Sequence, residues 1–381
     1  MTSQNIVGEN LRSIGYLATT FFMYDLALSL SGIFLPVYYL DSGLPLNQIL
    51  LLLLITFLVI GIVPTFLLTL FPQHFERTMT FGILSATLFF LALLVSRNPI
   101  ILGLTYGLFN AAFWPSFNLL TFRSTESMTR ATTISFLTVL LPAAAGIVGP
   151  LIGGYLIENF DFSSVFYLGG ILMIMAAMTS LKVKVQKTDV RFEFPQFSKS
   201  SPLILFVVVF VAGSLTEYYW LGYPLLLYRL TSSMFDLGVL ASLTSLLSSA
   251  SAVLIGRISD LKGRRIEFGV ISAAAASLYF VGLAFIKAPI QLLPVSVIGG
   301  IAIAFATPSI ALLADSFERK DYASILVIRE LFIMVGRFGN VFIMFLFIVS
   351  YQFQNYFLAL AVLTAFTIPL YLSFRFSYGL R

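Results

Sequence analysis

The sequence contains no cysteine, and this absence excludes several kinds of chemistry. Without thiols the chain cannot form disulfides, bind a metal through thiolates or use a cysteine nucleophile. His74 is the single histidine, so a metal site made of imidazole side chains is not expected either. A nucleotide-binding loop of the form G-x-x-x-x-G-K-[ST] is also missing from the sequence. We therefore expect no metal, no cofactor and no function driven by ATP.

Charged residues are scarce as well. They make up 10% of the 381 residues, whereas 59% are hydrophobic and 39 are phenylalanine. A soluble protein of this size would have to cover its surface with polar side chains, so a lipid bilayer is the natural solvent for this composition. The net charge of +5 could indicate nucleic-acid binding, but the lysine and arginine bias of cytoplasmic loops explains it better. We expect no nucleic-acid partner.

Long apolar runs predict an all-α polytopic membrane protein with 12 transmembrane helices, because each crossing needs roughly 20 apolar residues. Short polar or Gly/Pro stretches separate the runs. The expected spans are 14–39, 47–71, 78–96, 99–122, 132–157, 163–182, 202–228, 235–257, 266–286, 289–314, 322–349 and 352–374. The polar N-terminal stretch has no cleavage-site pattern, so the first span is expected to act as an uncleaved signal anchor.

The lysines and arginines orient these spans. With the N-terminus inside, most basic residues fall in connectors on the cytoplasmic side, among them the stretches 182–199 and 257–265. The connectors on the other side hold only Arg97, Arg229 and Lys287. This asymmetry predicts a multi-pass protein of the cell (plasma) membrane with both termini cytoplasmic.

Weak internal similarity indicates two halves. "FGILS" at residues 81–85 corresponds to "FGVIS" at 268–272, "PSFNLL" at 115–120 to "PSIALL" at 308–313, and Pro36 to Pro224. The offsets are 187, 193 and 188 residues. Together they predict two six-helix bundles of parallel topology, residues 1–182 and 202–381, joined by a cytoplasmic linker at 183–201. Such repeats place a substrate site at their interface.

The stretch "GRISDLKGRR" at residues 256–265 concentrates charge in a very apolar chain. It resembles the loop signature of the major facilitator superfamily, G-x-x-x-D-[RK]-x-G-R-[RK], through Gly256, Asp260, Gly263, Arg264 and Arg265. The resemblance implies a conformational-switch loop on the cytoplasmic side. The equivalent stretch of the first half, "FPQHFERTM", has lost the aspartate and both glycines. A solvated, positively charged loop is the alternative.

A second stretch, "GIVGPLIGG" at residues 146–154, resembles the G-P-x-x-G-G core found in span five of many antiporters of the superfamily. Gly149, Pro150, Gly153 and Gly154 match this core. Small residues let membrane helices approach closely, so these four form an expected helix-packing ridge. The resemblance implies an antiporter, and ordinary glycine-mediated packing remains the alternative.

Five ionisable residues lie well inside the expected spans: Asp25, Glu217, Arg329, Glu330 and Arg337. Each would cost about 2.5–3.5 kcal/mol at a lipid-facing helix centre, so they are expected to face a wet cavity or one another. Glu330 and Arg337 are seven residues apart, hence nearly on one helix face. They could belong to a proton or substrate cavity, or form a purely structural ion pair. Arg329 could reach the cytoplasmic surface.

Polar and aromatic residues complete the expected cavity. Asn118 lies on one face of its helix with Asn110 and Trp114, and Trp220 belongs to the stretch "TEYYWLGYP" around Glu217. Glu217 has no cation within a helical turn in the sequence, so it is expected to bind and release a proton during the transport cycle, with Asp25 as the other candidate.

The function favoured by these features is secondary active transport by alternating access, with proton-coupled export of small amphiphilic or cationic compounds. Proton-coupled uptake of an organic anion or sugar is the alternative, because arginines and asparagines also lie within the spans. An intramembrane enzyme or a channel is a remote possibility. The expected partners are a small-molecule substrate, protons and the lipid bilayer, and the chain is expected to act as a monomer.

Overall fold

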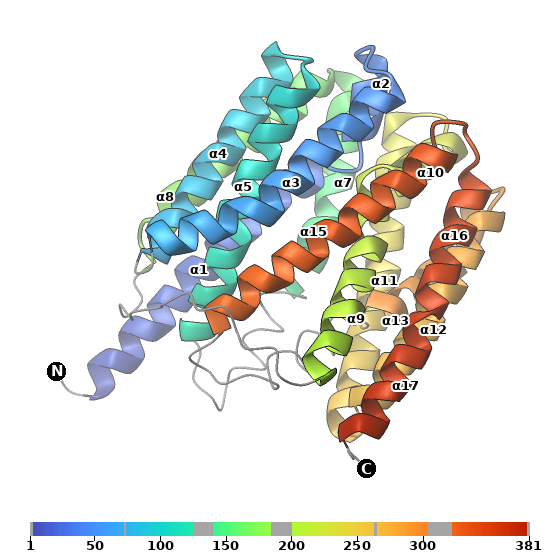
Figure 1. Cartoon of the computed structure of the whole chain (residues 1–381). Coiled ribbons are helices and arrows are strands. Elements are labelled where there is room, and N and C mark those ends of the chain that lie inside the picture. Colours follow the sequence, from blue (N-terminus) through green and yellow to red (C-terminus); the bar gives the residue numbers. More distant parts are fainter. Residues whose placement is uncertain are drawn as a thin grey trace. The chain divides into compact units, whose positions relative to one another are not determined.

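The computed structural model describes residues 3–71, 74–124, 137, 140–183, 200–262, 265–303 and 322–378, and its elements there are helices (Figure 1). Contacts divide the chain into two compact units. The first unit comprises Met1–Leu44, Leu51–Phe192 and Ser233–Ser242. The second unit comprises Pro45–Leu50, Glu193–Ser232 and Leu243–Arg381. The expected linker, residues 183–201, falls almost entirely outside the described ranges.

Most helices in the first part of the chain agree with the expected spans within a few residues, and the start of the fifth expected span, at residue 132, lies outside the described residues. The helices of this part are α1 (Ser3–Ser31), α2 (Leu35–Asp41), α3 (Leu46–Leu70), α4 (Phe75–Val95), α5 (Pro99–Ser124), α7 (Leu141–Asn159) and α8 (Phe162–Ser180). The first expected span is bent by 41° between α1 and α2. Pro36 lies in the first turn of α2, where its missing N–H is tolerated.

The second part of the chain repeats this pattern. Its elements are α9 (Ser200–Thr216), the 3-10 turn η2 (Glu217–Trp220), α10 (Gly222–Leu230), α11 (Met234–Lys262), α12 (Arg265–Phe285), the 3-10 turn η3 (Pro289–Gln291), α13 (Leu292–Ile303), α15 (Tyr322–Phe347), α16 (Phe353–Ala365) and α17 (Thr367–Tyr378). The seventh expected span is interrupted, as the first is, and Pro224 lies in the first turn of α10.

Among the described residues, eight helices are long and apolar enough to cross a bilayer, or nine if the bent α1–α2 pair is one span. Their outer faces are apolar too. On α3, for example, Leu51, Leu54, Leu58, Ile62 and Phe66 recur at helical spacing and are exposed. A soluble protein rarely exposes such a stripe, whereas lipid solvates it well. The helices therefore belong to a multi-pass membrane protein.

Each unit packs its helices around its own buried side chains. In the first unit α1 packs against α7 and α8, and α4 lies between α5 and α8 (Figure 1). In the second unit α15 packs along α9, while α12 contacts α13, α16 and α17. The core of the second unit includes Phe206 of α9, Ile328 of α15 and Tyr371 of α17.

Candidate functional site

The seventh expected span is broken near its middle, in the second unit. α9 ends at Thr216, the 3-10 turn η2 follows, and α10 begins at Gly222. A break of this kind leaves carbonyl groups in the last turn of α9 without their usual partners in the helix. Within a membrane such groups need other partners, because water is not there to bind them.

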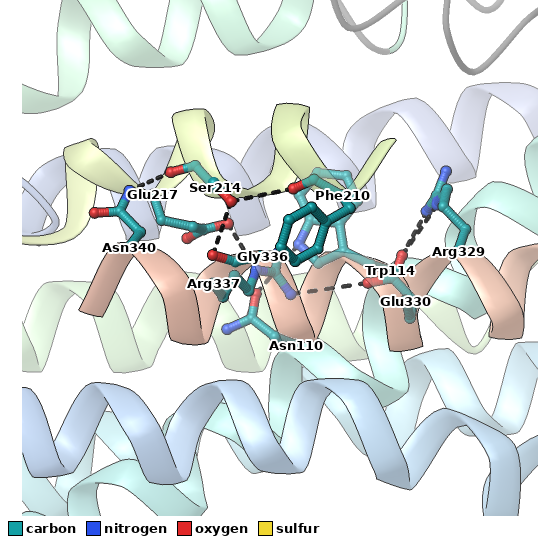
Figure 2. Close-up of polar contacts among 10 residues, drawn as sticks. All are labelled: Asn110, Trp114, Phe210, Ser214, Glu217, Arg329, Glu330, Gly336, Arg337 and Asn340. Carbon is teal, nitrogen blue, oxygen red and sulfur yellow. Dashed lines mark hydrogen bonds and ion pairs between the residues drawn. The ribbon is translucent and has the colours of Figure 1, made fainter. Parts of the chain in front are cut away.

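A cluster on α15 and α16 provides a partner for this break. The Asn340 side-chain amide donates a hydrogen bond to the Ser214 carbonyl oxygen, and the Tyr356 hydroxyl donates one to Asn340 Oδ1 over 3.0 Å. The Ser214 hydroxyl lies 2.9 Å from the Gly336 carbonyl oxygen and 3.2 Å from that of Phe210 (Figure 2). The last turn of α9 is thus fixed to α15 by polar contacts.

Four ionisable residues inside the spans of this unit form one continuous chain of side chains, which we call the charge chain: Glu217, Arg337, Glu330 and Arg329 (Figure 2). Arg337 Nε donates to Glu217 Oε1 over 2.6 Å, and Arg337 Nη1 lies 3.8 Å from Glu330 Oε2. Arg329 Nη2 donates to Glu330 Oε1 over 2.6 Å. The Glu217 residue is 2% exposed and Glu330 6%, so both carboxylates are buried.

This arrangement corrects two expectations. Glu217 is not a lone carboxylate, because Arg337 is brought to it from α15, 120 residues along the chain. Arg329 does not extend to a surface: it bonds to Glu330, and 11% of its side chain is exposed. The expected proximity of Glu330 and Arg337 is confirmed, since their long side chains bridge two helical turns.

Tyrosines surround the break on the side of α10 and α12. The hydroxyls of Tyr218 and Tyr279 lie 3.2 Å apart, and the Tyr223 hydroxyl is 3.0 Å from Thr244 Oγ1. Trp220, an expected site residue, ends η2 and is partly exposed. The charge chain therefore lies beside aromatic rings that carry hydroxyl groups.

Asp25 lies in the middle of α1, in the first unit, and is partly exposed. Its neighbour Tyr24 is fully buried and stacks on Phe113 of α5, with ring centroids 3.7 Å apart. Among the residues that the structure describes, Asp25 forms no hydrogen bond and no ion pair. Glu217 was expected to be the carboxylate without a nearby cation, but Arg337 lies beside it. In the described part of the chain it is Asp25 that has no cation beside it.

The expected polar face of α5 is formed. Trp114 Nε1 donates to Asn110 Oδ1 over 3.2 Å (Figure 2). Asn118, one turn further on, is partly exposed. The Asn110 amide also donates to the Tyr106 carbonyl oxygen over 3.0 Å. Asn118 forms no hydrogen bond with another described residue.

The glycine ridge of α7 lies against α1. A Cβ at Gly149 would collide with the backbone at Ser29 and Leu30, and a Cβ at Gly153 would collide with the Leu30 carbonyl oxygen. The backbones of the two helices therefore approach each other here in a way that only glycine allows.

The neighbouring face of the same ridge also makes close contacts within the first unit. A Cβ at Gly154 would meet the Met234 carbonyl oxygen, and one at Gly238 would meet that of Pro150. Glu158 Oε2 accepts a hydrogen bond from the Met234 backbone N–H over 2.9 Å. Pro150 lies inside α7, whose helix continues through it.

The expected switch loop is shorter than the sequence indicated. α11 continues to Lys262 instead of ending near residue 257, so Gly256 and Asp260 are helical, and Arg265 already begins α12. Gly263 and Arg264 lie outside the described residues. The charged stretch is thus mostly the end of one helix and the start of the next.

Sequence reasoning missed the residues that hold the break, chiefly Ser214, Gly336, Asn340 and Tyr356. A signal was present in the stretch "VGRFGNV" at residues 335–341, where two glycines and an asparagine interrupt an otherwise apolar span. The break itself could not be located, because nothing in "SLTEYYWLGYP" excludes a continuous helix before Pro224.

Comparison with known proteins identifies the family of this chain. A model of the Major Facilitator Superfamily matches this chain twice, over residues 17–204 and 205–377. The chain is 26% identical over 195 residues to the uncharacterized protein YqgE of Bacillus subtilis (strain 168), a match that covers 46% of this chain and 43% of YqgE. It is 28% identical over 163 residues to the multidrug resistance protein MdtG of Serratia proteamaculans (strain 568), covering 39% of each. These alignments span less than half the length of either relative.

Solved structures share the fold. A mutant form of the nucleoside transporter NupG superposes with a TM-score of 0.72 at 14% identity, covering 95% of this chain and 99% of that one. The human organic anion transporter MFSD10 (TETRAN) gives a TM-score of 0.70 at 11% identity, with the same coverage. At these identities the similarity concerns the fold alone.

Proposed function

This chain belongs to the major facilitator superfamily of transporters, and we propose that it is a secondary active transporter that exports small amphiphilic or cationic compounds in exchange for protons. Members of the superfamily transport substrates and do not catalyse reactions on them. We also propose that it has 12 spans in two parallel halves, 1–182 and 202–381, with the linker 183–201 and both termini in the cytoplasm, that it resides in the plasma membrane and that it acts as a monomer.

The observation that carries the proposal is the balance of charge inside the spans. Asp25, Glu217 and Glu330 are acidic, whereas Arg329 and Arg337 are the basic residues well inside the described spans. Glu217 and Glu330 are matched by the two arginines at 2.6 Å each. Asp25 is left over, and a carboxylate inside a span with no cation beside it among the described residues favours taking up a proton. We therefore assign the coupling proton to Asp25.

The same balance argues against the alternative, uptake of an organic anion. Both arginines already bind carboxylates of the protein, so an anionic substrate would have to displace Glu217 or Glu330. Such a displacement would leave a buried carboxylate uncompensated, which costs several kcal/mol. The similarity to MdtG also favours export, whereas the likeness to NupG and MFSD10 concerns the fold.

The test uses purified protein in vesicles that contain a pH-sensitive dye, with 1-methyl-4-phenylpyridinium as a cationic probe. We expect a gradient of the probe to drive protons across the membrane in the wild type. Asp25→Asn is expected to abolish this proton flux while still permitting the probe to move down its own gradient, because the variant keeps the shape of the side chain but cannot carry a proton.

The matched control is Asp41→Asn, which changes an exposed aspartate at the end of α2 and should leave proton flux unchanged. Proton flux that survives in Asp25→Asn would show that the coupling proton binds elsewhere. Co-movement of the probe and protons in the same direction would overturn export by exchange.

A further inference from the structure

We propose that the adjoining ends of α1 and α8 bind the phosphate group of an anionic phospholipid through Arg12, Tyr16 and Lys182. These residues lie in the first unit, on the side for which a cytoplasmic location is proposed above. The site goes beyond the proposed function, because it takes no part in binding the substrate or the proton. Its physical basis is the gathering of two cations and a phenol on one exposed surface.

The two helices are joined directly beside this surface. Thr20 Oγ1 on α1 lies 2.8 Å from Thr179 Oγ1 on α8. The chain is also held in place after the last turn of α8, because the Lys182 backbone N–H donates to the Thr179 carbonyl oxygen over 3.0 Å and the Val183 that follows is buried. The backbones that carry Tyr16 and Lys182 are therefore fixed next to each other before any ligand binds.

The side chains converge on one place. Lys182 Nζ lies over the Tyr16 ring, 5.6 Å from its centroid. Arg12 lies one turn before Tyr16 on α1, and side chains four residues apart on a helix are neighbours. All three residues are exposed. The Arg12 guanidinium and the Lys182 ammonium form no hydrogen bond or ion pair with the side chains that the structure describes, so both charges can meet an external anion.

The chemistry of the three groups fits a phospholipid phosphate. An ammonium, a guanidinium and a phenolic hydroxyl all donate hydrogen bonds, and phosphate oxygens accept them. Two cations would repel the ammonium of a zwitterionic headgroup, so a headgroup with net negative charge, such as phosphatidylglycerol, suits them better. Basic side chains near a membrane surface attract anionic lipids, and tyrosine is enriched at the level of the headgroups.

The neighbouring surface leaves room for the rest of the lipid. A Cβ added to Gly15, next to Tyr16, would meet no atom within 4 Å, so this part of α1 is not covered by another helix. Met175 and Met178 of α8 are exposed and lie deeper in the span than Lys182, where they offer apolar surface to an acyl chain. A headgroup bound by residues of both helices would tie α1 to α8, and bound lipid should therefore stabilise the fold.

The test measures thermal unfolding of the purified full chain in detergent while dioleoylphosphatidylglycerol is added, with dioleoylphosphatidylcholine as the reference lipid of the same acyl chains. We expect the anionic lipid to raise the unfolding temperature in a saturable way. Arg12→Gln and Lys182→Gln should each weaken its apparent affinity by about fivefold, the size expected for one basic residue near an anionic headgroup. Because both side chains are exposed, neither variant should change the unfolding temperature without lipid.

Arg77→Gln is the matched control. It removes the same charge from an exposed arginine near the start of α4, and this helix end lies on the same side of the unit, because Thr80 Oγ1 is 2.8 Å from Ser180 Oγ on α8. It should weaken the lipid affinity far less than Lys182→Gln. Equal losses in the two variants would show diffuse attraction to a positive surface and would overturn the site.

Two further outcomes would contradict the proposal. If both lipids stabilised the wild type equally, the cations would not select an anionic headgroup. If inorganic phosphate at the same concentration stabilised it as well as phosphatidylglycerol, the ligand would be a soluble anion and not a lipid. None of these measurements involves transport, so failure of the proposed export would leave them interpretable.

Discussion

At the scale of single residues, Asn340 explains how a membrane helix can be broken in its middle. Its amide donates to the Ser214 carbonyl oxygen at the end of α9, and its own oxygen accepts from Tyr356. Asn340 is fully buried, so none of these groups can turn to water instead. One side chain therefore satisfies polar groups on two other helices and fixes the position from which Glu217 extends.

Replacing this residue should be costly. In Asn340→Leu the Ser214 carbonyl and the Tyr356 hydroxyl lose their partner, and the free energy of unfolding should fall by about 1–3 kcal/mol. Tyr356→Phe removes one of the two bonds and should cost less, about 0.5–1.5 kcal/mol. Unfolding of the purified variants in detergent measures both effects.

The control is Asn355→Leu, because Asn355 is an exposed asparagine near the start of α16 that bonds to Gln352. This variant should change the stability by less than about 0.5 kcal/mol. If Asn355→Leu lowered the free energy of unfolding as much as Asn340→Leu, the buried hydrogen bonds of Asn340 would contribute no more to stability than the exposed one of Asn355.

At the scale of helices, the contact between α7 and α1 depends on the absence of side chains. Gly149 and Gly153 lie one turn apart on α7, and a Cβ at either would collide with the backbone of α1. Helices in lipid gain little from hydrophobic burial, so close van der Waals packing between backbones supplies much of their association. Asp25 lies on α1 a little more than one turn before this contact.

We predict that Gly153→Ala separates α7 from α1 and lowers the free energy of unfolding by about 1–3 kcal/mol, the usual cost of overpacking. Gly170→Ala is the matched control on α8, where the nearest atom to an added Cβ is 3.9 Å away. There the better helix propensity of alanine should leave stability unchanged or raise it by up to about 1 kcal/mol. Equal behaviour of the two variants in thermal unfolding would contradict close packing at Gly153.

At the scale of the whole molecule, the absence of cysteine makes the orientation easy to measure. Single cysteines can be placed at exposed positions with Arg97→Cys, Lys182→Cys and Lys287→Cys. From the lysine and arginine bias we expect a membrane-impermeant thiol reagent added to intact cells to label positions 97 and 287. Position 182 should react only after the cells are opened. Labelling of position 182 in intact cells would contradict the proposed cytoplasmic location of this connector.

The sequence by itself determined the class of protein and the order of its helices. Spans such as 47–71, 78–96 and 163–182 coincide with α3, α4 and α8 within a few residues. This follows from a local requirement: in lipid, each apolar run must satisfy its own backbone hydrogen bonds and therefore forms a helix. The match of the superfamily model over both halves agrees with the signatures and the repeat in the sequence.

Only the tertiary structure decided which charges meet. Glu217 and Arg337 are 120 residues apart, and no local pattern indicates that α9 and α15 bring them to 2.6 Å. The same holds for Asn340 and Ser214, and for the absence of a described partner at Asp25. Apolar patterning determines that a residue lies within a membrane, but packing between distant helices determines which side chains it faces. Whether a carboxylate has a cation beside it therefore depends on the tertiary structure, and this decides whether it forms an ion pair or can serve as a proton site.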